Sequence, residues 1–252
     1  MANDRLRDAL LRQSLTPAEL AEELHVDAKT VERWITVGRV PYARHRHKVA
    51  ARLQQSEGYL WPDALPADRV AEIATSEIVQ VFPSRAAVSR DLWRRLLDDA
   101  TQRIGVLVYS GLFLPEQHPR LNATLREKGR AGVTVRLVLG DPDSAQVAER
   151  GRDEGIDDAL ASKIRNVLVH YAPLRRASGV EVRLHATTLY NSLYWFDDEM
   201  LVNTHVYGLP AGHAPVLHLR RLSAGELFDA YIESFERVWA RSRPAWVSGA
   251  AA

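Results

Sequence analysis

The feature that most constrains the fold is a series of short apolar runs, rich in β-branched residues, that alternate with longer segments of helical periodicity. The runs IGVLVYS (104–110), VTVRLVLGD (133–141) and VEVRLHA (180–186) have the length and composition of buried strands. The segments 119–129 and 145–170 lie between them and have the apolar spacing of helices. Strands that alternate with helices predict an α/β fold.

Further elements are expected on both sides of this series. They are helices at 70–81, 87–103 and 224–242, and strands at 192–196, 200–204 and 214–221. A short turn at Asp197 and Asp198 joins two of these strands, so they are expected to form an antiparallel hairpin. The fold class we expect for this part of the chain is therefore α/β with a mixed sheet.

The first sixty residues predict short helices instead. Thr16, Pro17 and Glu19 form a helix start, because a hydroxyl caps the first turn, proline suits its first position and the carboxylate can bond back to the cap. After a break at 25–27, Asp27 caps a second helix. This part is expected to be all-α.

The residues between these two helices have the sizes that close packing requires. Ala21 permits close approach of the helices, and Val26, Val31 and Trp34 can fill the space between them. His25 stands where such turns often have glycine, but histidine tolerates a positive φ. The arrangement is typical of a helix-turn-helix, with an ordinary helical hairpin as the alternative.

A basic segment follows, RVPYARHRHKVAAR at 39–52, which contains no acidic residue. A solvated helix face would also be basic, but beside a helix-turn-helix the segment favours DNA binding. On the second helix, side chains can donate to guanine or accept from cytosine, and cations after it can contact phosphates. The residues expected to contact DNA are Lys29, Thr30, Glu32, Arg33, Arg39, Arg44, Arg46 and Lys48.

Three local features of the larger part carry a resemblance to a known family. They are the strand VRLH at 182–185, the hairpin that leads to Asn203, and FERVW at 235–239 in the last helix. Residues 87–241 resemble one half of the phospholipase D fold. The whole chain resembles actinobacterial helix-turn-helix regulators, of the repressor (XRE) or MerR and excisionase types, with a phospholipase D-like C-terminal domain.

Gly58, Pro62 and Pro66 mark a domain boundary, and the aromatic residues between them predict an ordered linker at 57–69. The resemblance then implies a DNA-binding domain at 1–56 and a sensor and dimerisation domain at 70–252. Phospholipase D chemistry uses a histidine, a lysine two positions later and an aspartate five positions after that lysine. If His185 is the histidine, Thr187 and Ser192 stand in place of the lysine and the aspartate. Loss of the cation would cost several kcal/mol of transition-state stabilisation, so we expect the domain to be catalytically inactive.

Polar residues near the strand ends still predict a ligand pocket, and the segment GDPD at 140–143 follows a strand directly. Each of these residues could instead be a hydrogen-bonded polar group of the core. The expected ligand-binding residues are Ser110, Arg136, Asp141, Arg183, His185, Thr187, Tyr190, Asn191, Ser192, Asn203, His205 and Tyr207. They suit a neutral or phosphate-bearing small molecule.

Composition excludes several other classes. The chain has no cysteine, which rules out disulfides and thiolate metal sites, and its histidines at 170, 205, 213 and 218 have no metal-ligand spacing. We expect no metal and no cofactor. The charged N-terminus MANDRLRDALLRQ does not resemble a signal peptide, and no apolar run reaches about 18 residues, so a soluble cytoplasmic protein is expected.

The leading hypothesis from the sequence is a ligand-responsive transcription regulator. It would act as a homodimer, because one helix-turn-helix makes few DNA contacts and a second half-site supplies the rest. One alternative is a phosphodiesterase or phosphoryl-transfer enzyme that uses His185 and is tethered to double-stranded DNA. Another is a protein-interaction module whose pocket binds a segment of a partner.

Overall fold

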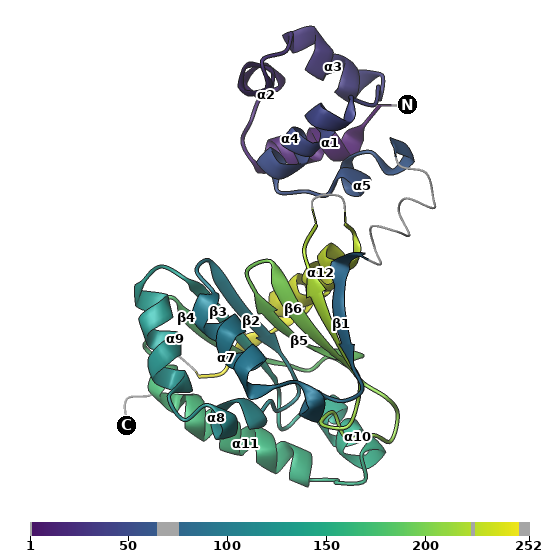
Figure 1. Ribbon diagram of the computed structural model, residues 1–252. Coiled ribbons are helices and arrows are strands. Elements are labelled where there is room, and N and C mark those ends of the chain that lie inside the picture. The colour runs from purple at the N-terminus through teal and green to yellow at the C-terminus, as the bar shows by residue number, and fades with distance from the viewer. Residues whose placement is uncertain (1, 65–75, 223–224, 247–252) are drawn as a thin grey trace. The chain divides into compact units, whose positions relative to one another are not determined.

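A computed structural model describes residues 2–64, 76–222 and 225–246 (Figure 1). The chain divides into two compact units, Met1–Glu77 with Arg221–Ala230, and Ile78–Arg220 with Tyr231–Ala252. The domain boundaries expected from the sequence stay a prediction, and residues 65–69 of the expected linker lie outside the described residues. In the part of the chain that is described, no helix is both long and apolar enough to cross a membrane.

The N-terminal unit is built from short helices around one apolar core. They are α1 (Asp4–Arg12), α2 (Pro17–Leu24), α3 (Ala28–Thr36), α4 (Ala43–Leu53) and α5 (Glu57–Leu60), followed by a 3-10 turn, η1 (Pro62–Ala64). Leu6, Leu20, Val31 and Trp34 are buried in this core, and so are Leu60 and Trp61 after α4. The segment that follows the helix-turn-helix therefore packs on the helices.

The turn between α2 and α3 is formed by the residues that the sequence singles out. The Thr16 hydroxyl accepts from the Glu19 amide (3.2 Å) while the Thr16 amide donates to Glu19 Oε2 (2.7 Å). His25 takes the left-handed conformation at φ 54°, and Asp27 Oδ1 accepts from the Lys29 amide at 2.8 Å to start α3. Two helix caps and one left-handed residue thus fix the geometry of the pair.

The larger unit contains a mixed sheet that, within the described residues, has eight strands in the order β1-β7-β6-β5-β2-β3-β4-β8. The strands are β1 (Ile78–Phe82), β2 (Arg103–Leu107), β3 (Thr134–Gly140), β4 (Val180–His185), β5 (Asn191–Phe196), β6 (Glu199–Thr204), β7 (Val216–Arg220) and β8 (Arg243–Pro244). β2, β3 and β4 are parallel, and the other neighbours are antiparallel. The expected fold class, an all-α part followed by an α/β part with a mixed sheet, is confirmed.

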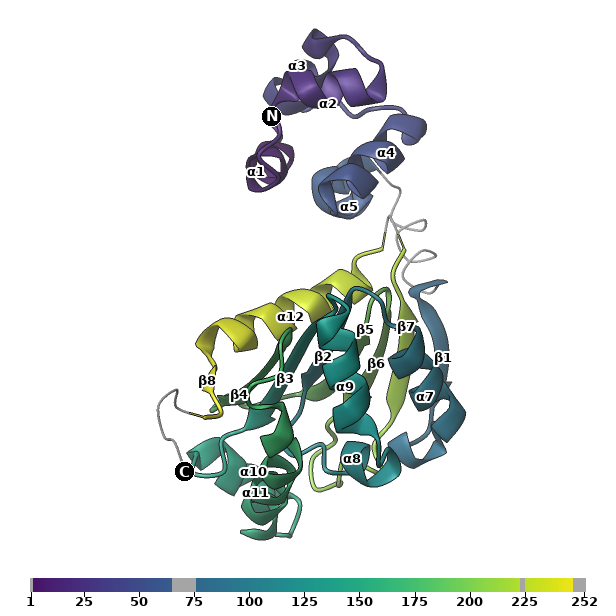
Figure 2. The ribbon, with the colours of Figure 1, turned by 90° about the vertical axis from the view of Figure 1, so that its left-hand side faces the viewer.

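Helices cover both faces of the sheet (Figure 2). They are α7 (Arg90–Asp99), α8 (Phe113–Gln117), α9 (Leu121–Arg130), α10 (Ala145–Asp153), α11 (Ala159–Tyr171) and α12 (Leu227–Arg241), with the 3-10 turns η2 (Arg85–Ala87) and η3 (Ala172–Leu174). Trp93 of α7 and Leu125 of α9 share one core with Leu137 of β3. Phe235 of α12 packs on Trp195 of β5 at the opposite face, with ring centroids 5.8 Å apart. The alternation of side chains along each strand separates these two layers.

The structure corrects several predicted elements. Residues 78–81 form strand β1 and not the end of a helix, because their backbone pairs with β7, about 140 positions later in the chain; residues 70–75 lie outside the described residues. The predicted helix at 145–170 is two helices, α10 and α11, separated near Gly155 and Asp157, which both have positive φ. The predicted helix at 87–103 is confined to α7, because Arg103 already belongs to β2. Neither α8 nor the two-residue strand β8 is predicted from the sequence.

Candidate functional site

The surface of α3 that faces away from the helical core is polar and charged. Val31, Trp34 and Ile35 are buried against the other helices. Lys29, Glu32 and Arg33 are exposed, and Thr30 is partly exposed. An amphipathic second helix of this kind can enter the major groove of DNA with its outer side chains.

The basic segment after α3 divides into exposed and buried cations. Arg39, Arg44 and Lys48 are exposed. Arg46 is not: its side chain is only 13% exposed, its Nε donates to Glu57 Oε2 at 3.1 Å and its Nη1 donates to the Pro41 carbonyl at 2.9 Å. Because Arg46 holds α4 against α5, it is removed from the set of residues assigned to phosphate contacts.

Three exposed apolar residues adjoin these cations and were not singled out in the sequence. Val37 and Val40 lie between α3 and α4, and Tyr42 is the N-cap residue of α4, with 76% of its surface exposed. They would add apolar contact area next to Arg39 and Arg44. The sequence alone does not distinguish them from core residues, because their burial depends on how α4 packs.

In the larger unit, His185 lies at the end of β4 and is 2% exposed. The Thr187 amide donates to its Nδ1 at 3.2 Å, so the ring proton is on Nε2, which lies 3.1 Å from the Val108 carbonyl and donates to it. Burial lowers the pKa of His185. Both ring nitrogens are therefore engaged in hydrogen bonds within the core.

A pocket of about 120 Å³ opens beside this histidine, where the chain leaves β2 and β6 and where β5 begins. Val108, Tyr109 and Gly111 form part of its wall. The polar side chains that line it are Arg85, Ser110, Glu154, Lys163, Ser192, Tyr194 and His205. Of the residues expected to bind a ligand, the pocket brings together Ser110, Ser192 and His205.

Ser192 and His205 form a hydrogen-bonded pair in this pocket. His205 Nδ1 lies 3.1 Å from the Leu189 carbonyl, which can only accept, so the ring proton is on Nδ1. His205 Nε2 then accepts from the Ser192 hydroxyl at 3.0 Å. Burial lowers the pKa of His205 to about 4, and the imidazole is neutral at physiological pH.

The other expected ligand residues lie outside the pocket. Arg136 and Arg183 are on the α12 face of the sheet, each 4.8 Å from the Trp239 ring centroid. Arg136 pairs with Glu236, and Asp141 pairs with Arg243 at 2.7 Å. Asn203 is buried and donates to the carbonyls of Ala214 and Pro215. The remaining residues of the set are exposed or at the sheet margin and do not line the pocket: Thr187, Tyr190, Asn191 and Tyr207.

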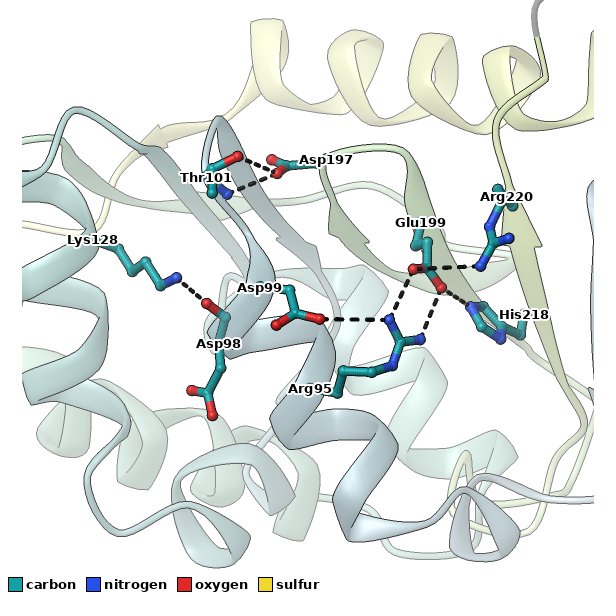
Figure 3. A network of polar contacts seen from close by, with 9 residues as sticks. All are labelled: Arg95, Asp98, Asp99, Thr101, Lys128, Asp197, Glu199, His218 and Arg220. Carbon is teal, nitrogen blue, oxygen red and sulfur yellow. Dashed lines mark hydrogen bonds and ion pairs between the residues drawn. The ribbon is translucent and has the colours of Figure 1, made fainter.

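A second polar network lies on the same face of the sheet as α7 and has a structural role (Figure 3). Glu199 accepts from both terminal nitrogens of Arg95 at 3.0 Å and from His218 Nε2 at 2.6 Å. Asp197 accepts from the amides of Thr101 and Arg103 at the start of β2. These contacts attach α7 and β2 to the β5–β6 hairpin. Among the described residues, no group of three or more acidic or histidine side chains could hold a metal ion.

Comparison with known proteins gives a family and two distant structural likenesses. Residues 74–246 match a family described as a domain of unknown function, DUF5919, and the chain belongs to that family. No curated protein matches the sequence.

The solved structures to which the chain is similar include Nuc, a phospholipase D family member from Salmonella typhimurium, with 16% identity over 67% of this chain and 97% of that one and a TM-score of 0.37. They also include TrmBL2, an archaeal chromatin protein whose structure is described as showing a novel mode of DNA binding. That likeness has 17% identity over 92% of this chain and 88% of the other, with a TM-score of 0.42.

Proposed function

We propose that the protein is a transcription regulator that binds double-stranded DNA as a homodimer, and that its α/β domain binds a small-molecule effector without catalysing a reaction. The observation that carries this proposal is the capped α2–α3 pair. One face of α3 is buried and the other presents Lys29 and Arg33 to solvent. A homodimer is included because paired half-sites about 34 Å apart supply the contacts that one short helix cannot make.

The division of roles among the cations makes the DNA-binding part testable. Arg33, on α3, would donate to base edges, whereas Arg44, on α4, would contact phosphate. A bidentate base contact contributes about 1–3 kcal/mol of discrimination, so Arg33→Ala should reduce affinity for the selected sequence by roughly 10- to 100-fold. Its effect on random DNA should be small, while Arg44→Ala should weaken binding to both.

The experiment is selection of binding sequences from random duplexes, followed by fluorescence anisotropy at fixed salt. Arg12→Ala serves as the matched control, because Arg12 is an exposed arginine at the end of α1 outside the α3–α4 surface. No sequence enrichment, or equal effects of Arg33→Ala and Arg12→Ala, would contradict the proposal. Genomic binding sites would then indicate the regulated genes and hence the effector.

Two observations support a non-catalytic α/β domain over a phosphodiesterase that uses His185. Thr187 has no cation to offer a developing phosphorane, and both nitrogens of His185 are hydrogen-bonded. A nucleophile needs a free nitrogen directed at the phosphorus. Turnover of phosphodiester substrates that disappears in His185→Ala but persists in His170→Ala would overturn this part of the proposal; His170 is an exposed histidine on α11.

A further inference from the structure

The pocket beside β2 is too small for a typical metabolite but large enough for a compact group. Ligand pockets that enclose drug-sized molecules have volumes of about 300–1,000 Å³. This one has a volume of about 120 Å³, well below that range. Its size therefore selects a small ligand, or the terminal group of a larger one.

The pocket has an excess of positive charge. Arg85 lies with its guanidinium 4.0 Å from the centroid of the Phe113 ring, so one face of the group is covered, and the group lines the pocket beside the Tyr194 hydroxyl. Lys163 lines the pocket from α11. The acid in the lining, Glu154, is bound to Arg150 at 2.6 Å, which neutralises its charge.

The pocket also contains a buried hydroxyl, that of Tyr194, which makes no hydrogen bond of regular geometry. The residue is only 1% exposed, and the side chains of Arg85 and Ser192 lie beside the hydroxyl. Burial raises its pKa, so it remains a neutral O–H donor. An unsatisfied buried hydroxyl costs about 1–3 kcal/mol, and a ligand that accepts from it would recover this free energy.

The neutral state of His205 limits which groups of the pocket can bind a ligand. Its Nε2 receives the Ser192 proton and its Nδ1 donates to Leu189, so the imidazole contributes neither a charge nor a free donor. The donors that remain in the lining are the two cations and the hydroxyls of Tyr194 and Ser110. Such a set, with a guanidinium, an ammonium and neutral hydroxyls, matches a tetrahedral oxyanion with several acceptor oxygens.

We propose that this pocket binds a phosphate-type oxyanion, either free or as the terminal group of a phosphomonoester, through Arg85, Lys163 and Tyr194. This inference rests on the proposed function, in which the α/β domain binds the effector, and it names the chemical class of that effector. The site does not depend on His185, which does not line the pocket. It is built from residues far apart in the sequence, on η2, α11 and β5.

The test is calorimetric titration of the full-length protein with inorganic phosphate, glycerol 3-phosphate and glycerol. We expect at least one of the two phosphate-bearing probes to bind, and glycerol not to bind. Tighter binding of inorganic phosphate would indicate that the ligand is free phosphate, and tighter binding of glycerol 3-phosphate would indicate a phosphomonoester. Arg85→Gln and Lys163→Met should each weaken binding at least tenfold. Tyr194→Phe, which keeps the ring in place against Trp93, should weaken it by roughly five- to tenfold.

The matched control is Arg165→Gln on α11, which removes an exposed cation that pairs with Asp143 outside the pocket and should leave phosphate binding unchanged. Arg85→Lys serves as a second variant if Arg85→Gln does not fold, and should retain weaker binding. Absence of phosphate binding by the wild type, or equal losses in Arg165→Gln and Lys163→Met, would overturn the inference. DNA affinity is measured on the same samples. A wild type that binds DNA but not phosphate contradicts only the phosphate site, whereas a wild type that does not bind DNA contradicts the proposed function.

Discussion

Replacement of Glu199 by glutamine should destabilise the α/β domain and flatten its response to acid. Glu199 is held by Arg95 through two bonds of 3.0 Å and by His218 at 2.6 Å, and the hydrogen bond from Arg95 is the largest cause that lowers its pKa to about 2. Since the folded pKa lies below the ordinary value of 4.5, the stabilisation is present above about pH 4.5 and is lost as the pH falls toward 2. Burial lowers the pKa of His218 as well, so its protonation also destabilises the fold as the pH falls below 6.5.

The magnitude follows from the same contacts. One pKa unit corresponds to about 1.36 kcal/mol, so the difference of about 2.5 between the folded and the ordinary pKa of Glu199 contributes at most about 3.4 kcal/mol to the free energy of unfolding. Arg95 and Arg220 are 43% and 56% exposed, and screening by solvent reduces this to about 2 kcal/mol. With a urea dependence of about 2 kcal/mol per molar, the unfolding midpoint of Glu199→Gln at pH 7 should fall by about 1 M.

The assay is urea denaturation of the full chain between pH 3 and pH 7. The matched control is Glu233→Gln on α12, because Glu233 is 59% exposed and forms an i,i+4 pair with Arg237 that contributes at most about 0.5 kcal/mol. An unchanged midpoint for Glu199→Gln at pH 7 would refute the reasoning. So would a pH profile parallel to that of the wild type.

Two further substitutions test how the domain is held together. Asp197→Ala should lower the free energy of unfolding by about 2 kcal/mol in a thermal or urea denaturation experiment. The substitution removes the acceptor of the Thr101, Gln102 and Arg103 amides and places alanine at a positive φ of 48°. Asp197→Asn should recover part of the loss, and equal stabilities of the two variants would count against this account. Gly129→Ala should destabilise the protein by about 2–3 kcal/mol, because the added Cβ would lie 2.2 Å from the Ser178 carbonyl oxygen. Helix propensity alone predicts that the free energy of unfolding rises by about 1 kcal/mol, and that result would contradict this contact.

Local patterns of the sequence were sufficient for the helix-turn-helix and for the strands of the sheet centre. Thr16, Glu19 and Asp27 cap their helices through bonds that span only two or three residues, so their effect does not depend on the rest of the fold. The runs at β2, β3 and β4 are mostly buried because helices cover both sides of the sheet. The prediction of a helix over 70–81 is wrong at β1, where IVQVF is rich in strand-forming residues and its backbone pairs with β7.

The candidate site could be predicted only in part. Ser192 and His205 lie next to strands that the sequence identifies, and the pocket contains both of them. Arg85 and Lys163 both precede these strands, on the separate elements η2 and α11, and no spacing connects them. Arg136 and Arg183 are expected in the pocket but lie on the α12 face of the sheet. The alternation of side chains along a strand shows which residues share a face of the sheet, but it does not show which helices cover that face.

By itself, the sequence determined the class of each major segment, the capped helix pair, and that Thr187 and Ser192 stand where a phospholipase D motif would have lysine and aspartate. These properties depend on residue type and on spacings of a few positions. The tertiary structure alone decided that Arg46 is withdrawn from the surface, that His185 is hydrogen-bonded at both nitrogens, and that Arg85, Lys163 and Tyr194 line one pocket. These outcomes depend on contacts between residues far apart in the chain, which packing of the helices on the sheet brings together.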